Sequence, residues 1–205
     1  MRAWFALVGT WLLASGCATG PSSTPEEAAY FSDCRDSAPD GAEAVLRFAG
    51  SRYQRQWQRL CDRAALRVFS APGGEGSQER LVTLARYPPD AEPRRTLDAY
   101  IARSASRRVA EPRIFERQDA GPATRYIAEL MLQRETPGEL AYLLHGVSRS
   151  DAGRVVSVTY THRFAAANDA GLARIKAEQG AWVRALERHL DDFPTLPKGR
   201  AAGAD

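Results

Sequence analysis

Residues Thr124–Phe164 read TRYIAELMLQRETPGELAYLLHGVSRSDAGRVVSVTYTHRF and contain three runs in which apolar and polar residues alternate. A period of two residues is typical of β-strands. Two short segments, Glu135–Gly138 and Ser150–Gly153, separate the runs, and each ends in the glycine that tight turns tolerate. The stretch therefore predicts a three-stranded antiparallel meander with two four-residue loops.

These loops place the three strands in one register, with a drier core face and a wetter opposite face. The predicted core face carries Tyr126, Ala128, Leu130, Leu132, Ala141, Leu143, His145, Val147, Val156, Val158, Tyr160, His162 and Phe164. The predicted wetter face carries Glu129, Gln133, Ser157, Thr159, Thr161 and Arg163, diluted by Ile127, Met131, Tyr142 and Leu144.

The N-terminus has the features of a secretory signal. An apolar run, Ala3–Leu13, is too short to cross a bilayer as a helix, and small residues follow it. The stretch Leu13-Ala14-Ser15-Gly16-Cys17 resembles a bacterial lipoprotein signal, whose lipobox ends in Gly-Cys, although Ala14 stands where that family prefers Leu. The resemblance implies that Cys17 becomes the first mature residue and is acylated. Because Ala18 and not Asp follows, it also implies the periplasmic leaflet of an outer membrane.

Composition divides the chain into four parts. Removal of residues 1–16 as a signal peptide leaves 189 of the 205 residues and takes away one arginine, so the formal charge falls from +3 to +2. Residues 17–40 are rich in Pro, Ser, Thr and Ala and predict a lipidated flexible tether. We expect a single α+β domain over residues 41–193 and a disordered tail over residues 194–205.

Two cysteines, Cys34 and Cys61, remain once Cys17 carries lipid. An oxidising compartment favours a disulfide between them, which would join the end of the tether to the domain and close a loop of about 28 residues. The alternative is two unpaired thiols, one of them buried in the core. A redox motif is not expected, because the sequence contains no Cys-x-x-Cys.

Further strands are predicted at Ala44–Ala49, Leu66–Ser70, Arg80–Tyr87 and Arg113–Gln118. Arg52–Cys61 fits either a helix or a strand, and we favour a strand because strands follow it directly. In that strand, one face would carry Tyr53, Arg55, Trp57, Arg59 and Cys61.

Helical spacing predicts two helices. Pro93–Arg108 places Leu97, Tyr100, Ile101 and Ser104 on one face. Leu172–Phe193 forms a longer helix that should cover the apolar face of the sheet. Its predicted stripe carries Leu172, Ile175, Gln179, Trp182, Val183, Leu186 and Leu190.

The order of these elements predicts an α+β fold, in which an antiparallel sheet with a central meander packs against a long C-terminal helix and one further helix. Over Val45–Phe193 this order resembles the PsbP-like sandwich: an early hairpin, a strand before Pro88-Pro89, a helix at Leu97–Tyr100, a strand, the meander, and a closing helix with Trp182. Members of that fold serve as adaptors, assembly factors and photosystem subunits. No residue motif carries a metal or photosystem role to this chain, and fold alone does not imply function.

The histidines offer little support for catalysis. His145, His162 and His189 belong to no motif typical of a hydrolase or metalloenzyme. On the predicted register, His145 lies opposite Val158 and about 13 Å along the strand from His162, too far for shared metal coordination. We therefore expect no metal, no cofactor and no enzyme activity. His145 is either a hydrogen-bonded core residue or the floor of a small pocket beneath the C-terminal helix.

Arginine is concentrated early in the domain. Six arginines lie within the 21 residues from 47 to 67, which contain one acid. They form either an ordinary solvated face or a surface that contacts phospholipid heads, lipopolysaccharide or an acidic envelope protein. The candidate contact residues are Arg52, Arg55 and Arg59. The envelope location excludes nucleic acid as a partner.

The sequence thus favours a non-catalytic envelope lipoprotein, held to the membrane by its lipid, whose soluble domain binds a protein or an anionic surface. The alternative is a small-ligand-binding protein or minor hydrolase, with a pocket between the sheet and the C-terminal helix near His145.

Overall fold

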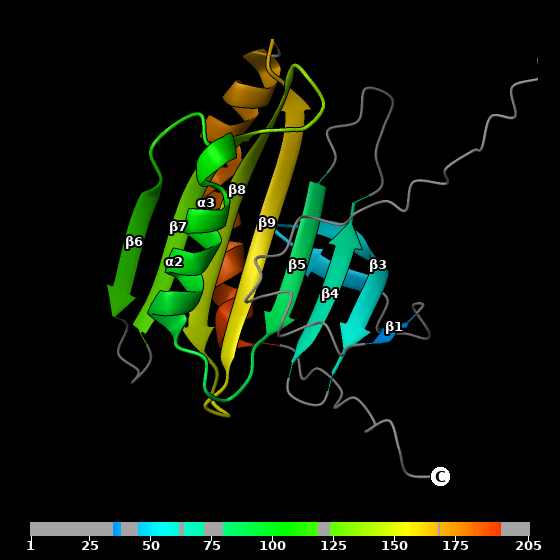
Figure 1. Cartoon of the computed structure of the whole chain (residues 1–205). Coiled ribbons are helices and arrows are strands. Elements are labelled where there is room, and N and C mark those ends of the chain that lie inside the picture. The colour runs from blue at the N-terminus through cyan, green and yellow to red at the C-terminus, as the bar shows by residue number, and fades with distance from the viewer. Residues whose placement is uncertain are drawn as a thin grey trace, which may run out of the picture.

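One antiparallel sheet organises the chain (Figure 1). The computed structural model describes residues 35–37, 45–61, 64–71, 80–118, 124–167 and 169–193. The expected signal peptide and C-terminal tail, and the expected tether apart from residues 35–37, lie outside these described residues. The sheet has nine strands in the order β1-β3-β4-β5-β9-β8-β7-β6, with β2 paired to β3 off this path.

The strands are β1 (Arg35–Ser37), β2 (Val45–Phe48), β3 (Ser51–Leu60), β4 (Ala65–Ser70), β5 (Arg80–Arg86), β6 (Arg113–Gln118), β7 (Thr124–Gln133), β8 (Glu139–Arg149) and β9 (Val155–Ala165). The described helices are α2 (Pro93–Arg103), the short 3₁₀ helix η2 (Ala105–Arg107) and α3 (Asp169–Asp191). The α+β class and the predicted strand at residues 52–61 are therefore confirmed.

The first predicted helix is shorter than expected. α2 ends at Arg103, and Ala105–Arg107 continue as a 3₁₀ turn. At this boundary the Ser104 hydroxyl donates a hydrogen bond to the Ile101 carbonyl at 2.8 Å. Such a side-chain bond competes with the regular helical ladder, which explains why the helix stops here.

The first hairpin of the meander has the predicted register. Leu130 lies opposite Leu143, and Ala128 lies opposite His145. The Arg134 amide donates to the Glu139 carbonyl at 3.0 Å and closes the loop where the sequence placed it.

The second hairpin differs from the prediction by one residue. Its loop has five residues, Ser150–Arg154, because Arg149 pairs with Val155 and the Ser150 amide donates to the Arg154 carbonyl at 2.8 Å. A slip of one residue moves every side chain of a strand to the other face. The predicted placement of β9 on the His145 face is therefore wrong, and His145 lies opposite Thr159, not Val158.

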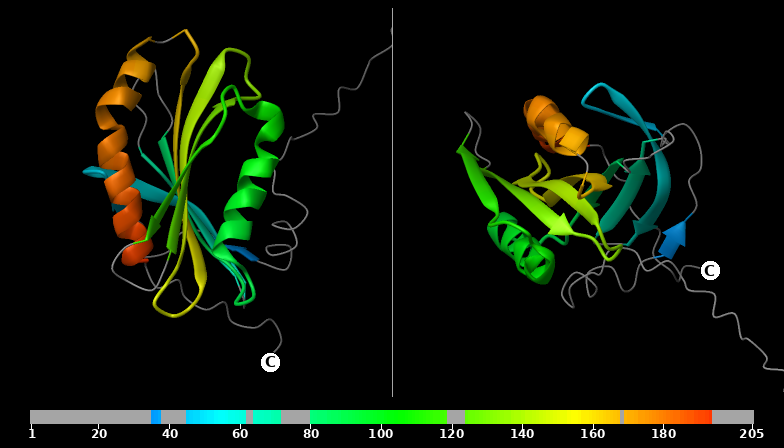
Figure 2. Two further views of the ribbon diagram at one scale, coloured as in Figure 1. Left: turned by 90° about the vertical axis from the view of Figure 1, so that its left-hand side faces the viewer. Right: turned by 90° about the horizontal axis from the view of Figure 1, so that it is seen from above.

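α3 covers one face of the sheet, as Figure 2 shows. On β7 and β8 this is the predicted wetter face, so the prediction that α3 covers the predicted core face is wrong there. Beneath α3, Leu144, Val158 and Tyr160 pack with Trp182 and Leu186 in the larger of two described core clusters. Most of the predicted α3 stripe is confirmed, but Leu172, at 39% exposed, lies outside that core.

α2 covers the opposite face, over β7 and β8 (Figure 2). Leu97 is fully buried there and packs with Ala128, Leu130 and Leu143. The prediction of one dry and one wetter face is therefore wrong, since the structure has apolar cores on both sides of the meander. Neither described α-helix combines the length and apolarity that a membrane span requires.

Candidate functional site

A β-bulge in β3 decides where the predicted arginines lie. Arg55 pairs with Phe69, whereas Trp57 pairs with Val68, so the register shifts between them. Phe69 and Val68 are neighbours in β4 and point to opposite faces, and Arg55 and Trp57 must therefore do the same. The predicted single face of Tyr53, Arg55, Trp57 and Arg59 is wrong for this reason.

Tyr53 and Arg55 lie on the face of β3 that turns toward the protein interior, which we call its inner side. Arg55 is only 5% exposed, and its Nη1 donates to Gln58 Oε1 at 3.1 Å. Arg67, on the neighbouring strand, is 4% exposed. Arg55 is thus removed from the surface on which the sequence placed it, and it cannot contact a macroscopic partner such as a membrane.

The outer side carries the other two candidates. Arg52 is exposed, and Arg59 is half-buried with its guanidinium 5.9 Å from the centroid of the partly exposed Trp57 ring. Because Arg52 precedes the bulge and Arg59 follows it, the extra residue brings both to the same side of the strand. Strict alternation would have separated them.

A tight turn before this strand brings one more arginine, Arg47, next to Arg52. Ala49 and Gly50 both have positive φ, 47° and 79°, which is typical of the two-residue turns that join hairpin strands. The turn places Arg47 directly opposite Arg52, and both side chains are exposed. An oppositely charged cross-strand pair contributes about 0.2–1 kcal/mol, whereas a like-charged pair such as this one opposes folding.

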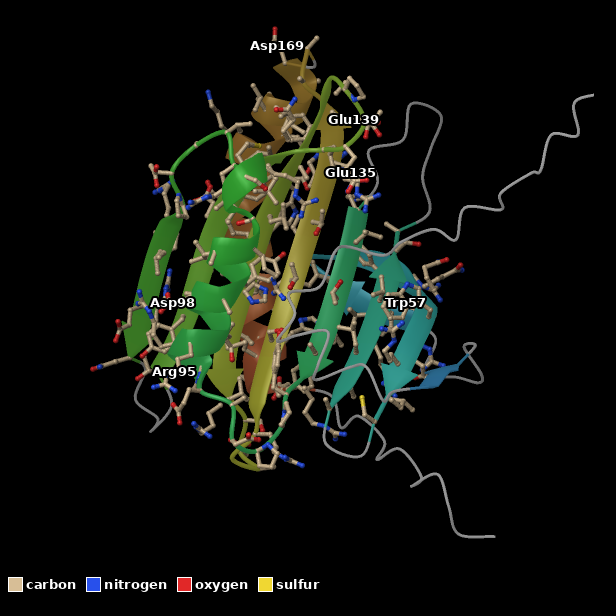
Figure 3. The ribbon with its side chains drawn as sticks, in the orientation of Figure 1. Trp57, Arg95, Asp98, Glu135, Glu139 and Asp169 are labelled. Atoms are coloured by element: carbon tan, nitrogen blue, oxygen red, sulfur yellow. The ribbon has the colours of Figure 1, made fainter. Side chains whose placement is uncertain are left out.

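We call these residues the hairpin outer face, and it comprises Val45, Arg47, Arg52, Trp57 and Arg59. Val45 is 41% exposed, unusually high for a large apolar residue in this structure. The inner side of the same hairpin turns toward α3, where the Phe48 ring lies 5.6 Å from that of His189. Figure 3 shows Trp57 on the β3 and β4 side of the sheet, far from β6.

His145 lies on the face that α2 covers. Its ring stacks on Tyr100 with centroids 3.7 Å apart, and its Nδ1 lies 2.7 Å from the Thr159 hydroxyl. Burial, together with the charge of Arg103, lowers the pKa of His145 to about 3. The ring is therefore neutral and packed into the core. The expected pocket at His145 beneath the C-terminal helix is wrong in position, because α2 and not α3 packs against this residue.

His162 lies on the opposite face, beneath α3. It pairs with Tyr142 and not with Ala141, and its ring centroid is 5.5 Å from that of Trp182. Burial, with the nearby charges of Arg174 and Arg80, lowers its pKa to about 4. Among the described residues, no three metal-ligating side chains gather into a group that could hold an ion.

Both Cys17 and Cys34 lie outside the described residues. The lipid attachment and the disulfide therefore remain predictions. One backbone observation bears on the disulfide: Arg35, which follows Cys34 in the sequence, pairs with Leu60, which precedes Cys61.

Comparison with models of protein families, with curated proteins and with solved structures found no match to this chain.

Proposed function

We propose that this chain is a non-catalytic envelope lipoprotein whose domain lies on an anionic membrane surface through the hairpin outer face. The observation that carries the proposal is the cross-strand pair of exposed arginines, Arg47 and Arg52. Their repulsion is relieved when a phosphate group lies between them. Guanidinium groups are well suited to this task, because they bind phosphate with two parallel hydrogen bonds.

The other members of the hairpin outer face fit the same partner. Trp side chains favour the boundary between lipid headgroups and acyl chains, and an exposed Val45 adds apolar area beside the charges. Arg59 lies over the ring of Trp57, so charge and aromatic surface are adjacent. This mixture distinguishes the surface from a purely solvated basic face.

The first described strand, β1, lies beside one end of the hairpin outer face. β1 pairs with Gln58–Leu60 of β3 and places Asp36 opposite Arg59, so the chain that follows the proposed lipid at Cys17 reaches the domain at the Arg59 end of this surface. Acylation at Cys17, an outer-membrane location facing the periplasm and the PsbP-like arrangement all belong to this proposal. The order of a hairpin, a meander and a closing helix supports that arrangement.

The test measures binding of the chain from residue 18 onward, which lacks Cys17 and therefore carries no acyl group, to phosphatidylglycerol and phosphatidylcholine vesicles. Each arginine near an anionic surface contributes about 1 kcal/mol, so Arg47→Gln with Arg52→Gln should lower the partition constant by about 30-fold. Binding should weaken as salt rises, and phosphatidylcholine should bind little. Because both side chains are exposed and their mutual repulsion is removed, the melting temperature should not fall.

The matched control is Arg184→Gln with Arg188→Gln, which removes the same charge from exposed positions on α3. We expect this variant to bind like the unmodified chain. An equal loss in both double variants would mean that only net charge matters, and the proposed surface would be wrong. Arg55 is left intact in this test, because a change at a buried arginine would affect folding.

A further inference from the structure

β6 forms the edge of the sheet opposite to β1 and β3 (Figure 1). It pairs with β7 alone, in an unbroken register from Arg113 opposite Glu129 to Gln118 opposite Thr124. No other strand in the described part of the chain pairs with it. About half of the backbone amides and carbonyls of such a strand point away from its neighbour, so β6 presents an open row of donors and acceptors.

Two of the usual devices that protect an edge strand, a proline and a β-bulge, are missing from β6. Its six residues contain no proline and its pairing shows no bulge. Its two arginines have carboxylate partners within the protein: Arg113 lies 3.3 Å from Glu129, and Arg117 lies 3.1 Å from Glu187 of α3, while their side chains stay 67% and 52% exposed.

A second copy of the chain fits this edge poorly. If two copies joined their β6 strands into one continuous sheet with two-fold symmetry, each β6 residue would lie opposite a residue whose side chain is on the same face of the sheet. The register centred on Phe115 places Arg113 opposite Arg117 twice, and the register centred on Glu116 places two Glu116 side chains together. The register centred on Ile114 brings Pro112, which has no amide hydrogen to donate, opposite Glu116. Like charges directly opposite one another are destabilising, which disfavours self-pairing.

We propose that β6 accepts an extended segment of another protein as an additional antiparallel strand. Ile114 and Glu116 lie on one face of β6, and both are exposed, Ile114 at 40%. A partner strand that places a basic residue opposite Glu116 presents the residue two positions later to Ile114. The partner is therefore a segment with the pattern basic, any residue, β-branched apolar.

This site goes beyond the proposed membrane contact. The hairpin outer face and β6 stand at opposite ends of the sheet, so a membrane and a protein segment can be bound together. The domain would then hold a partner strand at a membrane surface.

The test uses the chain from residue 18 onward and a synthetic peptide, Ser-Thr-Lys-Thr-Val-Thr-Ser, with amide hydrogen exchange measured by mass spectrometry. At a peptide concentration about ten times Kd, exchange of residues 113–118 should slow about ten-fold, while β3 is unchanged. A peptide with proline in place of the central threonine should have no effect. No slowing of β6 at excess peptide, or equal slowing by the proline peptide, would overturn the proposal.

A charge exchange tests the recognition itself. Glu116→Lys should weaken binding of the lysine peptide by about 2- to 30-fold, and a peptide with glutamate in place of lysine should restore binding to that variant. Equal binding of both peptides to both proteins would contradict the assigned pairing. A different result would be slow exchange of β6 without peptide that increases with protein concentration as a dimer forms in sedimentation experiments. In that case a second copy occupies the edge and the proposal is wrong. Phosphatidylglycerol vesicles should leave β6 exchange unchanged, which separates this site from the membrane contact.

Discussion

His162 shows how a single buried residue links stability to pH. Its side chain is fully buried among Trp182 and Phe164, and its pKa is lowered to about 4, whereas an unfolded histidine titrates near 6.5. Below pH 6.5 the unfolded chain therefore binds a proton that the folded chain excludes. The free energy of unfolding should fall as pH drops toward about 4, and this one residue should account for about 2 kcal/mol between pH 7 and pH 5.

The measurement is urea unfolding of the unmodified chain and of His162→Phe at both pH values. The variant keeps an aromatic ring but cannot take up a proton, so it should lose about 2 kcal/mol less on acidification. Carboxylates titrate alike in both proteins and cancel in the comparison. Equal losses would mean that His162 is not held neutral in the folded state.

At the scale of elements, the docking of α3 on β8 depends on Gly146. A methyl group built at this position would overlap Leu186 and would lie 2.9 Å from Leu190 Cδ1. Both leucines are buried, so they have little room to move. We predict that Gly146→Ala destabilises the fold by about 1–3 kcal/mol through overpacking, measured by urea unfolding.

Gly180 provides the matched control, because it lies on the exposed side of α3 and the nearest atom to a built methyl is Arg184 Nη1 at 3.4 Å. Alanine is preferred over glycine inside a helix by about 0.5–1 kcal/mol, so Gly180→Ala should stabilise the fold. If Gly146→Ala also stabilises it, the close approach of helix and strand is not a constraint.

At the scale of the whole molecule, the predicted Cys34–Cys61 disulfide would join the segment before β1 to the end of β3. In the chain from residue 18 onward, which lacks Cys17, alkylation under denaturing conditions without reductant should modify no cysteine, and two should react after reduction. Reduction should lower the free energy of unfolding by about 3 kcal/mol, because a loop of about 28 residues is released. Two adducts before reduction would show that the pair is not joined.

The sequence by itself determined most of the elements and the first hairpin. Alternation identified the strands, helical spacing identified the faces of α2 and α3, and the glycine turn at Gly138 set the pairing of Leu130 with Leu143. These features depend on neighbours in the chain, which is why local patterns were sufficient. The arginine concentration was visible as well, and so was the expectation that a strand divides its arginines between two faces, but which of them share a face was not.

Only the tertiary structure decided the face of β9 and the side of each arginine. All residues in 155–160 are buried, since α3 covers one face of β9 and the other face is also covered. Alternation then carries no information about register, and both a four- and a five-residue loop satisfy the pattern. The bulge between Arg55 and Trp57 was equally hidden, because it arises from pairing with β4. Long-range pairing thus placed His145 under α2 and assembled the hairpin outer face.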